Sequence, residues 1–347
     1  MASRKRQHLG RREEVAGLFK RPDSGWERAV LATLAFADAS GYPLTAAGVF
    51  ERLISPVRVG AAGHPSLGDV VGTLDALSSR GAVREHHGWY APTGTMHDAF
   101  VRHLDRLNIQ AEKWRRMRRY AWWFQAVPFV RAVFASGSLA QGRTGPDSDW
   151  DMFVVVRRNR LYTARTALMA VAWLMGRLRT KRDRIAPDRF CFNHYVTDDG
   201  LTLRHRSLFV AGALAGLVPV LDPDGLILIL RQANRWVGEY LASWPPPEPI
   251  SVVRTVRPSR FLRGIGRVAE IVLARAPGDW LERLLCGWQQ RRIGNEPATH
   301  AKGGRVTADE RELEFHPHSA ERAVLARYNA AMTGLGMPAG ERDSGLK

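Results

Sequence analysis

The sequence contains few cysteines and no long apolar run, and each shortage excludes a class of protein. Cys191 and Cys286 are the only cysteines in 347 residues, which excludes a disulfide scaffold and a zinc site built from cysteines. No run reaches the roughly 18 apolar residues of a membrane-spanning helix, and the stretch Leu208 to Leu221 is expected to form a buried helix. The basic N-terminus lacks the apolar core of a signal peptide. Together these features predict a cytoplasmic protein without a transmembrane segment.

Lysine is also scarce. Only six of the 51 basic residues are lysines, which leaves 45 arginines, and the net charge is +17. The planar guanidinium group suits phosphate, so this excess favours a polyanionic partner or substrate. An arginine-rich and lysine-poor composition also arises from a GC-rich genome without any function attached, and the composition does not decide between these two explanations.

The patterning predicts an α+β protein with a small mixed-sheet core. At roughly 100–200 residues per domain, the length predicts two domains, with room for a small third one. The segments that we predict are a basic arm (1–24), a compact module (25–95), a connecting helix (96–127), a catalytic-type core (128–245) and a helical C-terminal region (250–347). A semi-rigid, proline-rich hinge, Ser243 to Pro249, separates the last two.

The compact module resembles a winged helix-turn-helix, because three helical patterns precede a hairpin. Thr45 can cap the second helix, Ser66 and Asp69 form a capping-box pattern at the third, and the hairpin turns at His87-Gly88. The third helix would enter a DNA groove, but it carries Asp69 and Asp75 and only one late arginine. Such a helix is repelled by phosphates. The sequence therefore favours a packing or partner-docking module over specific DNA binding.

The stretch from Val130 to Val156 carries the most specific chemical signal. An apolar strand breaks at Gly137-Ser138, and a second apolar strand begins at Asp149-Trp150-Asp151. Side chains at i and i+2 of a strand share a face, so the two carboxylates should project together. Paired carboxylates of this kind bind Mg²⁺ or Mn²⁺, which take their remaining ligands from phosphates and water. A glycine allows the backbone to approach a triphosphate closely.

These residues resemble the nucleotidyltransferase superfamily typified by DNA polymerase beta, over roughly residues 100–245. Within it, the stretch is most similar to microbial stand-alone nucleotidyltransferase domain proteins. Those have an arginine and a Cys-x-Asn strand downstream, comparable to Arg165 and to Cys191-Phe192-Asn193. The resemblance implies that a nucleoside monophosphate moves from a nucleoside triphosphate to a hydroxyl acceptor, which is a small molecule, a protein or an RNA.

The resemblance, together with the residue chemistry, implies a role for each site residue. Asp149 and Asp151 hold the metal, Gly137 and Ser138 hold the phosphates, and Asn193 orients a metal or a water molecule. The superfamily usually has a third carboxylate where this chain has Asn193, which cannot accept a proton.

Two aspartates and a histidine are candidates to replace the missing carboxylate. Asp188 and Asp199 lie at the ends of the same strand. His194 is expected on the face opposite to Asn193.

A basic tract follows the second strand, and within it Arg165 is the residue that we expect to contact a phosphate. The tract comprises Arg157, Arg158, Arg160, Arg165, Arg177, Arg179, Lys181, Arg182 and Arg184. An alternative function also remains open, because of Asn193. In that alternative the chain is a non-catalytic regulator that keeps the fold, senses a nucleotide and binds DNA or protein.

Overall fold

The computed structural model describes residues 25–93, 97–180, 183–246, 254–317 and 319–345. The expected N-terminal arm (1–24) and residues 247–249 of the proline-rich hinge lie outside these residues. The fold is mixed α+β, as expected, with one small and one larger sheet. No described helix is both long enough and apolar enough to cross a membrane.

The N-terminal module contains the helices and the hairpin that the sequence predicts. They are α2 (Gly25–Ala39), α3 (Ala46–Glu51), α4 (Leu67–Ser79), β2 (Val83–His86) and β3 (Trp89–Pro92), and a short strand β1 (Leu44–Thr45) pairs with β3. The Thr45 side chain caps α3, and Ser66 and Asp69 cap α4 reciprocally, so both predicted caps are confirmed. The hairpin turn is also confirmed, because His87 and Gly88 both have positive φ.

The core is built on a six-stranded mixed sheet in the order β7-β4-β5-β6-β9-β8. Its strands are β4 (Val130–Ala135), β5 (Trp150–Val156), β6 (Phe190–Thr197), β7 (Val218–Leu221), β8 (Arg305–Ala308) and β9 (Glu312–His316). Only β5 and β6 run parallel. The expected single helix from Leu208 to Leu221 is wrong, because this stretch forms α8 (Leu208–Ala215) and then strand β7.

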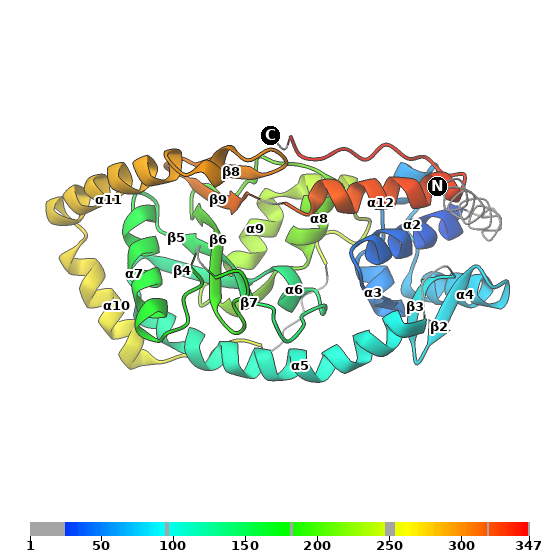
Figure 1. Ribbon diagram of the computed structural model, residues 1–347, viewed down its shortest axis with the longest axis horizontal. Helices are drawn as coiled ribbons and strands as arrows, with labels where there is room; N and C mark the ends of the chain where they lie inside the picture. The colour runs from blue at the N-terminus through cyan, green and yellow to red at the C-terminus, as the bar shows by residue number, and fades with distance from the viewer. Residues whose placement is uncertain (1–24, 94–96, 181–182, 247–253, 318, 346–347) are drawn as a thin grey trace, which may run out of the picture.

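Helices cover both faces of this sheet. One face packs on α8, α9 (Leu226–Ala233) and α12 (Glu321–Gly334), and this cluster continues into the N-terminal module. The other face packs on α5 (His97–Ala121), η2 (Trp122–Ala126) and α7 (Leu161–Leu174). Figure 1 shows α5 running along one side of the molecule, from the N-terminal hairpin to the core.

The C-terminal region is not purely helical. It contributes α10 (Arg260–Val272), α11 (Ala276–Gly294) and α12, but also β8 and β9, which extend the core sheet beyond β6. Helices α10 and α11 are separate, and Pro277 lies in the first turn of the second. Helix α12 packs against α2 of the N-terminal module (Figure 1). The ring centroids of Phe36 and Tyr328 lie 5.8 Å apart at this contact.

Candidate active site

Asp149 and Asp151 converge at the start of β5. A possible ligand atom from each of Asp149, Asp151 and Cys191 lies within 4.8 Å of the other two. Asp151 and Cys191 are direct neighbours across the parallel pair β5 and β6, so their side chains leave the sheet on the same face. Trp150 between the two aspartates is fully buried. The prediction that the two carboxylates project together, with the tryptophan packed behind them, is confirmed.

The two carboxylates create an excess of negative charge. Burial, and then the charge of Asp149, raise the pKa of Asp151 to about 7. Burial and the two carboxylates likewise raise the pKa of the Cys191 thiol, which keeps it protonated at neutral pH. A bound cation would remove the repulsion between the carboxylates, and their oxygen ligands suit Mg²⁺ or Mn²⁺. The donor set therefore fits the predicted metal.

Asn193 reaches the carboxylate pair. Its Nδ2 donates a hydrogen bond of 2.8 Å to Oδ1 of Asp151. Because the pairing register shifts between Met152 and Phe153, Asn193 is the extra residue of a β-bulge in β6. The next residue, His194, therefore does not alternate to the opposite face as we expected. It lies beside Phe153, with ring centroids 4.6 Å apart, on the same face as Asp151.

His194 is nevertheless already engaged. Its Nε2 lies 2.9 Å from Oε1 of Glu312. His194, Glu314 and His316 also bring possible metal ligands together, but both carboxylate oxygens of Glu314 accept hydrogen bonds from Arg305 at 2.8 and 2.6 Å. This second cluster is an internal ion network that links β6, β8 and β9.

Arg179 pairs directly with Asp149. Its Nη1 donates to Oδ2 of that carboxylate and lies 4.0 Å from the sulfur of Cys191. The guanidinium thereby neutralises part of the charge that a metal ion would otherwise offset. The sequence had placed Arg179 within the basic tract but had not distinguished it from the other arginines.

Gly137 permits the close approach of β4 and β5 at the site. Its φ is +59°, and a Cβ atom at this position would lie 2.1 Å from Oδ2 and 2.9 Å from Cγ of Asp151. It begins the four-residue helix α6 (Gly137–Ala140), which also contains the half-buried Ser138. Backbone hydrogen bonding joins the two strands here, since the Ser136 N–H donates to the Asp151 carbonyl at 2.9 Å. A side chain at Gly137 would therefore displace the carboxylate.

A buried lysine on α5 supports the strand that carries the carboxylates. Lys113 Nζ donates to the Ser148 carbonyl at 2.7 Å and to Oδ1 of Asp188 at 3.0 Å. Arg116 donates to the other oxygen of Asp188 at 2.7 Å. Lys113 is itself buried, although the neighbouring basic residues Arg115 and Arg116 of the same helix are exposed. In the sequence, the feature that could have indicated burial of Lys113 is its place next to Trp114, as a lysine in an otherwise arginine-rich helix.

The two replacement aspartates do not reach the site. Burial raises the pKa of Asp188, but the hydrogen bonds and charges of Arg116 and Lys113 outweigh burial and hold it below its usual value. Asp188 is therefore a structural ion-pair partner. Asp199 lies beyond the C-terminal end of β6, far along the strand from Asn193, and accepts a hydrogen bond from Thr197 at 2.7 Å.

Arg165 is not brought to the carboxylates. It packs on the opposite face of the sheet, with its guanidinium carbon 5.9 Å from the ring centre of Tyr195 and 5.0 Å from that of Phe315. Its Nη1 donates to Gln289 of α11. The assignment of Arg165 to a phosphate is corrected accordingly. Lys181 and Arg182, also in the basic tract, lie outside the described residues.

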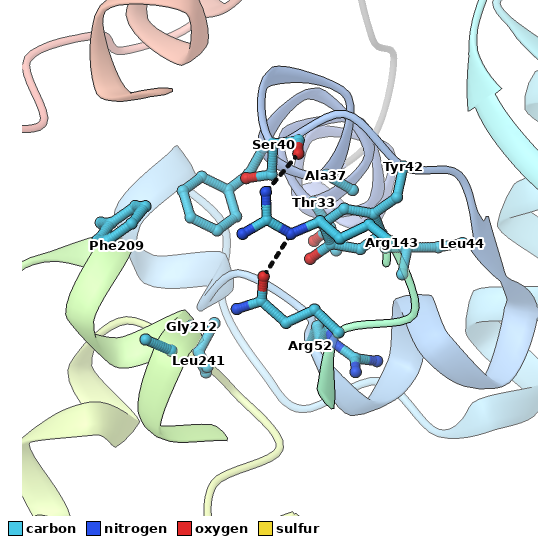
Figure 2. A pocket seen from close by; sticks show the side chains of 13 residues that line it. Thr33, Ala37, Ser40, Tyr42, Leu44, Arg52, Arg143, Phe209, Gly212 and Leu241 are labelled. Carbon is cyan, nitrogen blue, oxygen red and sulfur yellow. Dashed lines mark hydrogen bonds between the residues drawn. The ribbon is translucent and has the colours of Figure 1, made fainter. Parts of the chain in front are cut away.

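A cleft between the N-terminal module and the core adjoins the glycine-serine turn. Arg143, six residues after Gly137, donates to the Ser40 carbonyl at 3.1 Å and to Gln141 Oε1 at 2.8 Å (Figure 2). Burial lowers the pKa of Arg143, while the charge of Asp151 acts in the opposite direction. The cleft therefore combines a half-buried cation with the aromatic side chains of Phe36 and Phe209.

Comparisons with protein families, with curated proteins and with solved structures found no match for this chain. The interpretation of the site consequently depends on its residues and their geometry.

Proposed function

We propose that this chain is a metal-dependent nucleotidyltransferase that moves a nucleoside monophosphate from a nucleoside triphosphate to a hydroxyl acceptor. One observation carries the proposal. Asp149 and Asp151 converge on one face at the start of β5, and Asp151 lies directly against the positive-φ Gly137 that follows β4. This is the arrangement that the resemblance to polymerase-beta-type nucleotidyltransferases calls for, and the mixed sheet is compatible with it.

Asp149 and Asp151 would hold Mg²⁺ or Mn²⁺, which would supply charge neutralisation on the phosphates and activation of the acceptor hydroxyl. The Cys191 thiol is a poor ligand for these ions, because it is soft and its raised pKa keeps it protonated. Gly137 and Ser138 offer backbone N–H groups and a hydroxyl to the β- and γ-phosphates. Arg179 pairs with Asp149, and with a cation held by the carboxylates its guanidinium would be available to bind a phosphate.

Asn193 orients Asp151 through its amide but cannot take a proton from the acceptor. We therefore expect slow turnover. The same observation favours the second candidate function, a non-catalytic nucleotide-sensing regulator that retains the fold and binds DNA or protein. The acidic residues Asp69 and Asp75 on α4 support a protein-docking role for the N-terminal module, which we interpret as winged-helix-like.

The test is incubation of the purified protein with each α-labelled nucleoside triphosphate and Mg²⁺ or Mn²⁺. The variant Asp149→Ala/Asp151→Ala should lose product formation, whereas Asp147→Ala, which alters an exposed neighbouring aspartate, should retain it. Labelled product that depends on the aspartate pair supports the transferase. Metal-dependent nucleotide binding without consumption supports the sensor. Absence of nucleotide binding contradicts both candidates.

A further inference from the structure

The end of the molecule opposite the N-terminal module carries large apolar side chains that no described part of the chain covers. Helices α10 and α11 form this end (Figure 1). Eight of their apolar side chains are between 45% and 75% exposed: Phe261, Ile265, Val268, Ile271, Val272, Trp280, Leu284 and Trp288. Monomeric proteins seldom expose so many large apolar groups on consecutive elements without a binding role.

These side chains follow the periodicity of the two helices. On α10, Phe261, Ile265, Val268 and Val272 are spaced by four, three and four residues, so they share one face. Leu262 is buried against the core and lies on a different side of the same helix. On α11, the residues at 280, 284 and 288 are spaced by four and form a second stripe. Both helices therefore have a packed side and a separate, exposed apolar side.

The acidic residues of these helices all turn towards the core. Glu270 accepts hydrogen bonds from Arg131 at 2.8 Å and from the Phe129 N–H at 2.7 Å. Asp279 pairs with Arg160. Glu282, the third, accepts from the backbone N–H groups of residues 162 and 163 at 2.9 and 2.8 Å. Each carboxylate between residues 260 and 294 thus has a partner in the core: arginines for Glu270 and Asp279, and N–H groups for Glu282.

Arginines of these two helices and of the turn between them face outward. Arg260, Arg263, Arg267, Arg275, Arg283 and Arg291 are exposed, and none has an ion pair within the described part of the chain. On α10, the arginine side lies next to the exposed apolar face, because residues 260, 263 and 267 occupy the neighbouring sector of the helix. The surface therefore combines a strong, unpaired positive charge with bulky apolar groups.

We propose that the α10–α11 end is a docking surface for a membrane that contains anionic phospholipids. The apolar side chains would enter the boundary between headgroups and acyl chains, while the arginines contact lipid phosphates. Charge complementarity favours an anionic membrane over the other possible partners of this surface. A second copy of the chain would place arginines against arginines, and a nucleic acid would leave the apolar stripes exposed to water.

The test measures co-flotation of the full chain with phosphatidylcholine vesicles that contain or lack phosphatidylglycerol, in low and in high salt. We expect binding that requires phosphatidylglycerol and weakens with salt. Phe261→Ser/Val268→Ser should reduce it at least tenfold. Arg263→Gln/Arg267→Gln should reduce it about 25-fold, at roughly fivefold per arginine near the surface.

Matched controls remove equivalent groups elsewhere. Val57→Ser/Leu67→Ser removes two exposed apolar side chains of the N-terminal module. Arg235→Gln/Arg342→Gln removes two exposed charges far from α10. Both controls should bind like the parent chain, and circular dichroism should show that every variant is folded.

Three results would overturn the proposal. The first is a parent chain that does not bind phosphatidylglycerol vesicles, or whose binding is unchanged in both α10 variants. The second is a dimer in analytical ultracentrifugation that Phe261→Ser/Val268→Ser dissociates, because the apolar face would then belong to a second copy. The third is salt-sensitive binding to nucleic acid that Arg263→Gln/Arg267→Gln abolishes, without binding to vesicles.

Discussion

Replacement of Gly137 by alanine tests the geometry of the site most directly. The backbone at Gly137 has φ +59°, and left-handed backbone costs about 1–2 kcal/mol for a residue with a Cβ. In addition, the new Cβ would lie 2.1 Å from Oδ2 of Asp151, and overpacking of this kind costs about 1–3 kcal/mol. Gly137→Ala should therefore lower the free energy of unfolding by about 3 kcal/mol.

A glycine with the same backbone strain but open surroundings separates the two contributions. Gly176 has φ +66°, and a Cβ there would meet nothing within 4 Å, so Gly176→Ala should cost only about 1.5 kcal/mol. In an Asp151→Ala background the two nearest atoms are absent, and Gly137→Ala should then also cost about 1.5 kcal/mol. The assay is urea unfolding in the presence of a chelator, with comparison of midpoints and slopes. An equal cost of Gly137→Ala in both backgrounds would refute the inferred contact with the carboxylate.

Two further predictions concern the charges around β5. Because the pKa of Asp151 is raised from 3.8 to about 7, the folded chain binds a proton more tightly than the unfolded chain. Stability should therefore fall as the pH rises from about 4 to 7. Asp151→Asn should match the parent near pH 4 and exceed it by up to about 4 kcal/mol at pH 8 without metal, as measured by urea unfolding. Asp147→Asn is the control, and the same pH profile in the parent and in Asp151→Asn would contradict the shift. Lys113→Met should lower the free energy of unfolding by about 3 kcal/mol at pH 7, because it leaves the buried Asp188 with Arg116 alone. The control Arg115→Met, on the exposed side of α5, should change this free energy by less than about 0.5 kcal/mol. Equal effects of these two substitutions would show that the Lys113 ion pair is not needed.

Local patterns were sufficient for several elements. The capping residues Thr45 and Ser66, the turn at His87 and Gly88, and the two apolar strands around the aspartate pair all depend on neighbours within a few positions. Such features are set by backbone conformation and by hydrogen bonds to nearby amides. They can therefore be predicted from the sequence without knowledge of the rest of the fold.

Other features depend on residues far apart in the chain. The β-bulge at Asn193 reverses the expected alternation of His194, and it arises from the pairing of β6 with β5, 40 residues earlier in the chain. The C-terminal strand β9 joins β6, although composition indicated only helices after residue 250. Lys113 and Arg179 become site residues only because Ser148 and Asp149 lie next to them in space.

The sequence by itself determined the α+β class, the approximate elements, and the paired position of Asp149 and Asp151, because i and i+2 alternation within a strand needs no tertiary information. Only the tertiary structure decided which charges neutralise those carboxylates and which helices keep an exposed apolar side. It also decided that Arg165 lies on the face of the core sheet opposite to the carboxylates. The physical reason is that burial and charge pairing depend on distances across the whole chain. Periodicity identifies an amphipathic helix but does not specify what covers it.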